Sequence, residues 1–300
     1  MDGILLVDKP EGTTSAGVIR ALRGRLGGRK VGHLGTLDPF ASGLLPLCVG
    51  EATKIARYLI VENKAYEGSI RLGVATETLD LTGAVTERAD VPALSAAVVA
   101  EAGRGFLGEI RQTPPMFSAI KQGGVPLYRL ARKGVRVERE ARSVRIDAFE
   151  LALQGGDRIA FRVRCSKGTY VRVLAADLGR ALGTVAHLER LRRTEVGRFH
   201  VRDAWPVEAL RDAPADAALP LVPIATALEG LARFPLPPRA LAMLRRGQQQ
   251  PLATLPAGAE GETALLVGEQ GDDVSGLIEM HAGTGWRLVR LLVPGQALQR

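Results

Sequence analysis

Residues 143–165 read SVRIDAFELALQGGDRIAFRVRC, and this stretch decides the expected fold class. Two runs rich in apolar residues flank a Gly-Gly-Asp tripeptide at 155–157, a composition that favours a tight turn between two strands. In the second run, apolar side chains alternate with arginines, so one face of the strand is apolar and the other is charged: Ile159, Phe161, Val163 and Cys165 against Arg162 and Arg164. The pattern predicts an antiparallel hairpin of residues 143–153 and 158–165.

A helix is expected directly after this hairpin, over 171–182, because leucines recur on one helical face and Gly183 is typical of a residue that ends a helix. Upstream, the sequence predicts strands over 3–7, 44–49 and 66–72, a helix capped by Ser15, a helical stretch over 51–60 and a glycine-rich loop over 27–43. These elements lack the strand–helix–strand order of a parallel sheet. The expected fold class is α+β, with a mixed, largely antiparallel sheet flanked by helices.

The C-terminal part of the chain differs in composition from the rest. Six of the 17 prolines lie between residues 214 and 238, which is typical of a linker. Beyond them, short apolar runs are separated by glycine and aspartate, at 264–267, 277–280 and 288–293. We therefore expect a larger domain over residues 1–230 and a small β-rich domain over residues 231–300.

The charge of the chain is basic and unevenly distributed. The formal net charge is +8, and 33 of the 40 basic residues are arginine, which favours a polyanionic partner. Residues 111–145 hold nine basic and two acidic side chains, whereas residues 258–285 hold six acidic and no basic ones. A phosphate backbone would be attracted to the first segment and repelled by the second. The alternative for 111–145 is an ordinary solvated surface.

Several classes of protein are disfavoured by what the sequence lacks. No apolar run approaches the ~18 residues of a membrane helix, and the start of the chain has no basic and apolar stretch typical of a secretory signal. Two cysteines in 300 residues fit a reducing cytoplasm. The sequence has no P-loop, no G-x-G-x-x-G after the first strand and no G-x-S-x-G, and its four histidines are scattered. If the chain is an enzyme, we expect it to need neither a metal nor a dinucleotide cofactor.

The segment VGHLGTLDPFASG at 31–43 is an unusual loop, because it combines glycines and a proline with apolar side chains. Asp38 precedes Pro39, which biases the aspartate toward an extended conformation. A carboxylate held in this way, and partly shielded from water, can act as a nucleophile or as an electrostatic stabiliser. The commoner role of aspartate before proline is simply to form a turn.

The string GHLGTLDPFASGLLP at 32–46 resembles the catalytic motif of the TruB-type tRNA pseudouridine synthases. Four further blocks match this family in order and spacing: GILLVDKP at 3–10, KAY at 64–66 with RLG at 71–73, PPMFSA at 114–119, and CSKGTYVR at 165–172. The match runs from about residue 3 to residue 200. One departure is Leu34, where the family more often has threonine. Residues 231–300 resemble the family's small PUA-like RNA-binding module loosely.

The resemblance implies the pseudouridine synthase fold and the conversion of uridine 55 in the T loop of tRNA to pseudouridine. The uracil leaves C1′ through N1 and returns through C5, without redox change or net hydrolysis, so no cofactor is implied. Asp38 corresponds to the family's essential aspartate. Attack on the sugar, addition to the base and assistance to a glycal intermediate all remain open as its role.

The resemblance also assigns neighbours to Asp38. Arg172 matches the arginine that pairs with it, and an adjacent guanidinium keeps a buried carboxylate ionised. Tyr66 matches the tyrosine that stacks on the target base and is suspected of assisting proton transfer. Asp80 matches an acid that would hold Arg172. An ordinary arginine in the first helical turn and a plain core tyrosine are the structural alternatives for Arg172 and Tyr66.

Four more residues receive implied roles. Tyr170 and Leu191 match positions that line the uracil pocket, although Leu191 is equally typical of a core leucine. His33 would fill the gap that the extracted base leaves in the stack, because imidazole can stack on a base and hydrogen-bond its edge. Lys9 is expected to support the catalytic loop.

The implied partner is tRNA, bound through its T stem-loop, and no membrane or protein partner is expected. The segment 111–145 resembles the mobile insertion that clamps the T-loop side of the tRNA, and we expect it to be disordered or displaced without RNA. We expect a cytoplasmic monomer. Two other functions remain open: a non-catalytic tRNA-binding or tRNA-folding protein, and a synthase that acts on another RNA through a guide complex.

Overall fold

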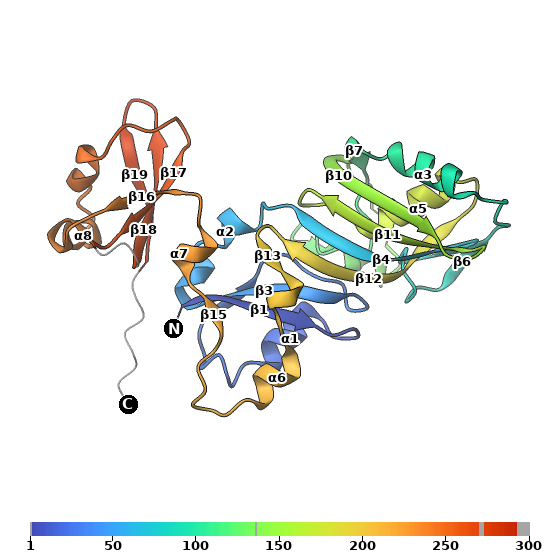
Figure 1. Ribbon diagram of the computed structural model, residues 1–300, viewed down its shortest axis with the longest axis horizontal. Coiled ribbons are helices and arrows are strands. Elements are labelled where there is room, and N and C mark those ends of the chain that lie inside the picture. The colour runs from blue at the N-terminus through green and yellow to red at the C-terminus, as the bar shows by residue number, and fades with distance from the viewer. Residues whose placement is uncertain (1, 136, 270–272, 293–300) are drawn as a thin grey trace.

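The structure is a computed structural model that describes residues 2–135, 137–269 and 273–292. Within these residues the chain forms a long curved sheet and a smaller separate sheet (Figure 1). No helix of the described residues is long and apolar enough to cross a membrane.

The larger sheet has eleven strands in the described part of the chain. They are β1 (Gly3–Lys9), β2 (Val31–His33), β3 (Ser42–Val49), β4 (Lys64–Leu72), β7 (Gly108–Gln112), β10 (Arg142–Leu153), β11 (Arg158–Cys165), β12 (Ala186–Val196), β13 (Phe199–His200), β14 (Trp205–Pro206) and β15 (Leu221–Val222). The order is β14-β1-β3-β12-β4-β11-β10-β7, with β2, β13 and β15 paired beside it. Only β1–β14 and β3–β12 pair in parallel within this sheet, so the predicted mixed, largely antiparallel sheet is confirmed.

The predicted hairpin is β10 and β11. Leu153 pairs with Ile159 next to the turn, and Gly155 has the positive φ of 72° that a tight turn favours. The apolar side chains of β11 are buried, as their alternation predicted. β11 then pairs with β4, where Val163 lies opposite Tyr66. The hairpin therefore extends the sheet that carries one of the predicted site residues.

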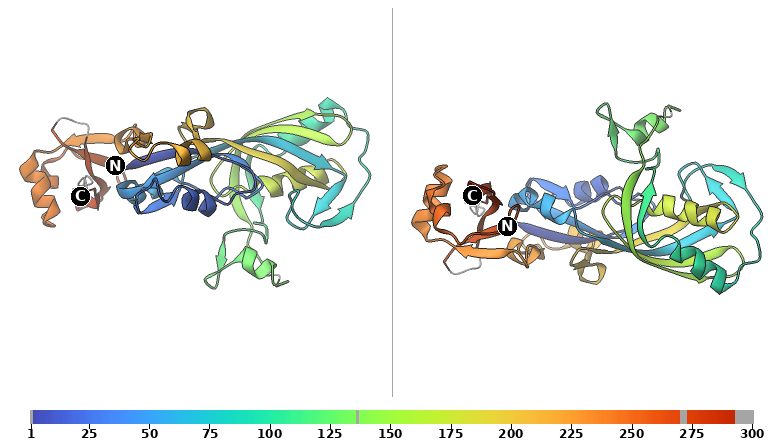
Figure 2. Two further views of the ribbon diagram at one scale, coloured as in Figure 1. Left: turned by 90° about the horizontal axis from the view of Figure 1, so that it is seen from below. Right: turned by 90° about the horizontal axis from the view of Figure 1, so that it is seen from above.

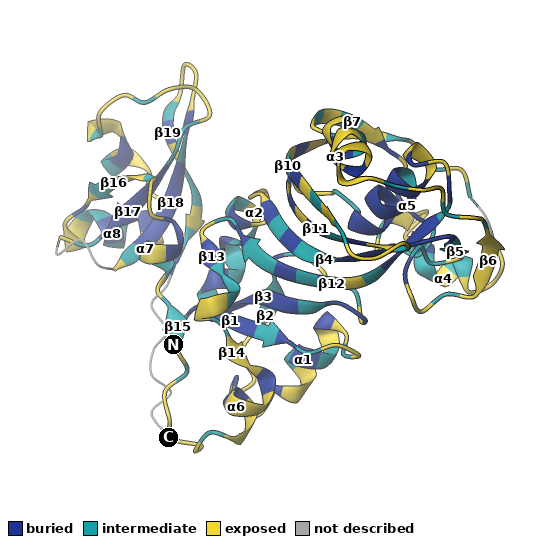
Figure 3. Cartoon of the chain, turned by 45° about the vertical axis from the view of Figure 1, so that its right-hand side comes forward, coloured by how far each residue is buried: buried dark blue, intermediate teal, exposed yellow. Residues whose placement is uncertain are grey.

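Helices cover the sheet on different sides. They are α1 (Ser15–Ala21), α2 (Ala56–Leu59), α3 (Ala96–Arg104), α4 (Leu127–Ala131), α5 (Val171–Ala181), α6 (Val207–Asp212), α7 (Ile224–Ala227) and α8 (Pro238–Arg245). The apolar faces of α3 and α5 share a core cluster with β4, β11 and β12, and most of α5 is buried (Figure 3). Helices α1 and α6 share a second cluster with β1 and β3. The predicted helix over 171–182 is thus confirmed as α5, which Gly183 ends with a φ of 77°.

The smaller sheet comprises β16 (Ala232–Pro235), β17 (Thr263–Val267), β18 (Val274–His281) and β19 (Gly285–Leu291) in sequential order. The three predicted apolar runs lie in β17, β18 and β19, except that Val293 is outside the described residues. Leu265 and Leu277 of this sheet join a core cluster with Ile4 and Leu44 of the larger one. The domain boundary near residue 230 stays a prediction, because side chains from both sheets share this cluster.

Three local predictions were wrong. The stretch 27–43 was expected to be a loop but contains the strand β2, whose backbone pairs with β3. The glycines in and around β2 hide the alternation of apolar and polar residues by which a strand is recognised in a sequence. Thr14, not Ser15, caps α1: the Thr14 hydroxyl accepts a hydrogen bond from Gly17 N (2.9 Å). The helical stretch 51–60 is divided into a 3-10 turn, Gly50–Lys54, and the short α2.

An arm of residues 113–141 projects from the sheet between β7 and β10 (Figure 2). It carries α4 and the short strands β8 (Lys121–Gln122) and β9 (Val125–Pro126). The arm is shorter than the predicted insertion 111–145, because Arg111, Arg142 and Arg145 lie within the strands β7 and β10. Arg136 lies outside the described residues, and the displacement of the arm without RNA stays a prediction.

Candidate active site

The loop that carries Asp38 is tied to the start of the chain by two side chains. Lys9 is fully buried, and its Nζ donates to the carbonyls of Pro10 (2.8 Å), Thr13 (2.7 Å) and Pro39 (3.2 Å). Burial lowers the pKa of Lys9 to about 8, which leaves most of this amine protonated at neutral pH. Ser15 accepts from Leu37 N (3.0 Å) and donates to Leu37 O (3.2 Å). The backbone on both sides of Asp38 is therefore fixed.

A buried arginine that the sequence analysis did not single out holds the other side of this loop. Arg193 on β12 is 1% exposed, and its guanidinium donates to the carbonyls of Gly35 (3.1 Å), Thr36 (3.4 Å) and Leu44 (2.7 Å). Gly43 lets the backbones of β3 and β12 approach closely here, because a Cβ at this position would lie 2.3 Å from the Arg193 carbonyl oxygen. One guanidinium thus ties together the two ends of the segment that contains Asp38.

Arg172, in the first turn of α5, forms a two-pronged ion pair with Asp38. Its Nε lies 2.9 Å from Asp38 Oδ2, and its Nη2 lies 3.2 Å from Asp38 Oδ1. The same guanidinium donates to the carbonyls of Thr78 (2.9 Å) and Phe117 (2.8 Å) and is only 4% exposed. A planar fork bound at this many points aims the carboxylate in one direction.

Asp80 supports Arg172 from behind. Its Oδ2 lies 3.6 Å from Arg172 Nη1, while its Oδ1 accepts from Thr78 Oγ1 (2.7 Å), Thr82 N (2.9 Å) and Thr82 Oγ1 (2.6 Å). The preceding residue, Leu79, has a φ of 61°, an uncommon backbone conformation for leucine. This loop, between β5 (Val74–Thr76) and β6 (Val85–Arg88), is therefore held in a strained form that presents Asp80 to Arg172.

Burial and ion pairing act in opposite directions on the pKa values of the acidic groups in the site. Burial raises the pKa of Asp38, and the Arg172 guanidinium acts in the opposite direction. The Asp38 side chain nevertheless remains 32% exposed, so a ligand can reach the carboxylate. Tyr66 is buried on β4, and burial raises the pKa of its phenol to about 12, with Arg193 acting in the opposite direction. The phenol is therefore neutral at physiological pH.

The structure places the remaining predicted residues around this centre. Leu191 is buried in the core cluster that also contains Tyr66, Leu37 and Phe40. Tyr170 is half-buried directly before α5. His33 is half-buried at the end of β2, rather than in a loop as the sequence predicted. Its Nδ1 is buried and has no hydrogen-bond partner among the described residues, and burial lowers its pKa, which favours the neutral imidazole.

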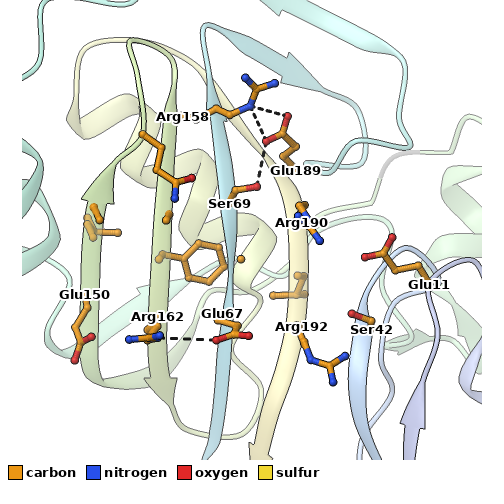
Figure 4. A pocket seen from close by; sticks show the side chains of 17 residues that line it. Glu11, Ser42, Glu67, Ser69, Glu150, Arg158, Arg162, Glu189, Arg190 and Arg192 are labelled. Atoms are coloured by element: carbon orange, nitrogen blue, oxygen red, sulfur yellow. Dashed lines mark hydrogen bonds and ion pairs between the residues drawn. The ribbon is translucent and has the colours of Figure 1, made fainter. Parts of the chain in front are cut away.

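A hollow of about 1020 Å³ lies on the opposite face of the sheet (Figure 4). Glu67 and Ser69 of β4 line it, whereas their neighbour Tyr66 points into the core. Most of its arginines pair with carboxylates, as in Arg158 Nε with Glu189 Oε2 at 3.1 Å and Arg192 Nη2 with Asp8 Oδ2 at 2.7 Å. Leu191 is the one predicted site residue among the described residues that line this hollow. Because the hollow holds none of Asp38, Asp80 and Arg172, it is a poorer candidate for catalysis than the centre around Asp38.

Two family models match adjacent parts of the chain and together cover residues 23–227. The model described as "TruB family pseudouridylate synthase (N terminal domain)" matches residues 23–171, and that described as "tRNA pseudouridylate synthase B C-terminal domain" matches residues 172–227. The relative named "tRNA pseudouridine synthase B" from Aromatoleum aromaticum is 46% identical over 262 residues, covering 87% of this chain and 84% of the relative. The chain belongs to the TruB family.

Further matches agree with this membership. A second TruB-family relative of the same name, from Opitutus terrae, is 49% identical over 214 residues, covering 71% of this chain and 89% of the relative. A chain in the crystal structure of a Cbf5–Nop10–Gar1 complex is 25% identical with a TM-score of 0.74, covering 97% of this chain and 85% of that one. The resemblance predicted from five sequence blocks and the predicted fold class are confirmed.

Sequence reasoning missed three residues that support this TruB-family site. They are Ser15 and Arg193, described above, and Gln112, whose buried amide accepts from Tyr170 N (2.7 Å) and donates to Tyr170 O (3.1 Å). Gln112 thereby fixes the residue before α5 to the base of the arm. A signal for Arg193 was present, because it lies two residues after Leu191 on the same strand face.

Proposed function

We propose that the chain isomerises uridine 55 in the T loop of tRNA to pseudouridine. The single observation that carries this proposal is the two-pronged ion pair of Asp38 with Arg172, beside an inward-facing tyrosine, in a chain that belongs to the TruB family. The conversion is an isomerisation. The C1′–N1 bond breaks, a C1′–C5 bond forms, and the C5 proton leaves while N1 gains a proton.

Each residue of the centre has a role in this reaction. Arg172 keeps Asp38 ionised and directs it at the ribose or the uracil, as attack on the sugar, addition to the base or assistance to a glycal intermediate requires. Tyr66 stacks on the detached uracil, and its neutral hydroxyl assists proton transfer. Asp80 holds Arg172, and Tyr170 and Leu191 line the pocket.

The target base is stacked inside folded tRNA and must be extracted before it meets Asp38. His33, which is half-buried at the end of β2, fills the gap that the base leaves, because an imidazole can stack on a neighbouring base. The basic arm within 111–145 clamps the T-loop side of the tRNA. Residues 1–230 form the catalytic unit, residues 231–300 are a PUA-like RNA-binding module, and the protein acts as a cytoplasmic monomer without a cofactor.

The test replaces the carboxylate by an amide of the same shape, Asp38→Asn. Pure protein is incubated with a T stem-loop transcript, and pseudouridine is mapped at single-nucleotide resolution. We expect conversion at position 55 by the wild type and a loss of at least about 10³-fold in the variant, with the Kd for RNA unchanged within threefold. The matched control, Asp177→Asn on α5, changes an aspartate that pairs with Arg180 and leaves turnover intact.

Each alternative function has its own outcome in this experiment. If the wild type and Asp38→Asn bind RNA equally well and neither makes pseudouridine, the chain is a non-catalytic tRNA-binding protein. Conversion only after addition of a guide RNA and its proteins would indicate the guide-dependent synthase. Either result contradicts the proposal.

A further inference from the structure

A second hollow, of about 360 Å³, lies between α1 and the turn that leads into β2. Its apolar lining packs against the core cluster of β1 and β3, and its arginines are exposed. We name it the α1 hollow; its lining includes Ile19, Leu26 and Val31 together with Arg20, Arg23 and Arg29.

The positive charge of the α1 hollow is not neutralised within the protein. Residues 12–37 contain five basic side chains and no acidic one. Arg25 is engaged, because it donates to the carbonyls of Pro214 (2.6 Å) and Ala217 (2.7 Å). The other four form no ion pair with any described residue: Arg20, Arg23, Arg29 and Lys30. In the hollow on the sheet face, by contrast, three of the four arginines pair with carboxylates: Arg158, Arg162 and Arg192.

The α1 hollow adjoins the catalytic loop at two points. Val31 lines the hollow and begins β2, and His33 ends the same strand about 7 Å further on. At the other end, Ser15 at the start of α1 is hydrogen-bonded to Leu37, the neighbour of Asp38. The hollow therefore adjoins both ends of the segment that leads to Asp38.

We propose that the α1 hollow binds the sugar–phosphate backbone of the RNA substrate next to the extracted nucleotide. A guanidinium offers a planar fork that matches a phosphate, and the apolar lining offers a surface for a ribose. Exposed arginines without carboxylate partners bind phosphate without first breaking an ion pair. The inference rests on the proposed function for the identity of the ligand, but it concerns affinity and not the chemical step.

The test is the triple variant Arg20→Gln, Arg23→Gln, Arg29→Gln, measured with a full-length tRNA transcript. We expect the Kd to rise by about 10- to 100-fold and the slope of log K against log salt to shrink by about 2 to 3, one phosphate contact per arginine. Turnover at saturating RNA should stay within twofold of the wild type. The corresponding lysine triple variant should retain the salt slope, because the charges remain.

A matched control removes three exposed arginines that already pair with carboxylates: Arg104→Gln, Arg180→Gln and Arg202→Gln. We expect less than a threefold change in Kd. An equal loss in this control would show a general effect of net charge and would overturn the inference, as would an unchanged salt slope in the test variant. If the wild type binds tRNA but makes no pseudouridine, the proposed function fails while the binding measurement still decides the role of the hollow.

Discussion

The arginines near the catalytic loop fall into two sets that differ in burial and in partners. Arg172 and Arg193 are almost fully buried and each contacts at least three acceptors, whereas the arginines of the α1 hollow are exposed and form no ion pair with a described residue. Removing a guanidinium from water is costly unless fixed acceptors replace the hydration. The buried set therefore fixes geometry, and the exposed set keeps its charge available for a polyanion.

The largest effect is expected where the buried set touches the reacting carboxylate. In Arg172→Lys a single ammonium cannot reach both oxygens of Asp38 and the carbonyls of Thr78 and Phe117 at once. We expect the single-turnover rate constant at saturating enzyme to fall by at least about 10²-fold, with the Kd for RNA little changed. Arg180→Lys on the same helix is the control, since Arg180 is 67% exposed and should stay within twofold. A threefold or smaller loss in Arg172→Lys would break the distinction between the two sets.

A smaller effect is expected where the buried set acts only through the backbone. In Arg193→Lys at least one of the Gly35, Thr36 and Leu44 carbonyls loses its donor, at about 1–3 kcal/mol for each buried group left unpaired. We expect a lower Tm and, in addition, a roughly tenfold lower kcat at unchanged KM, because Asp38 is less well aimed.

The control for this residue is its neighbour. Arg192 lies next to it on β12 and pairs with Asp8 at 2.7 Å, so Arg192→Lys should leave both kcat and Tm nearly unchanged. If Arg193→Lys lowered Tm alone and left kcat intact, Arg193 would be a purely structural residue rather than a positioning one.

Regular periodicity made much of this fold predictable from the sequence. An alternation of apolar and polar residues predicted the strand over 66–72 on which Tyr66 is buried, and the leucine spacing of α5 predicted the helix whose first turn carries Arg172. Both patterns arise because one face of each element packs against the core. Membership of the TruB family could also be predicted, since five short blocks keep their order and spacing along the chain.

Contacts between distant segments could not be predicted in this way. The strand β2 has three residues, and only its pairing with β3 makes it a strand. Alternation from Leu191 indicates which of Arg192 and Arg193 faces inward, but not that the buried guanidinium of Arg193 meets the carbonyls of the catalytic loop. Ser15 resembled a helix cap, but its hydroxyl is engaged by Leu37, 22 residues away, and Thr14 takes the capping role.

At pH values near neutrality the smallest effect is expected from pH, whose influence on the wild type separates the two sets in a single experiment. Guanidinium groups stay protonated across the pH range in which the protein can be assayed. The arginines of the α1 hollow should therefore give the Kd for RNA no pH dependence. Turnover needs ionised Asp38, whose pKa is raised by burial, so the proton is retained to higher pH than on an exposed aspartate. As the pH falls, kcat at saturating T stem-loop should therefore decline about tenfold per pH unit, with a midpoint above the ~3.9 of an exposed aspartate. A midpoint at or below that value would show that the carboxylate is not shielded as the structure places it. A Kd that follows the same curve as kcat would show that binding and the ionisation of Asp38 are not separate.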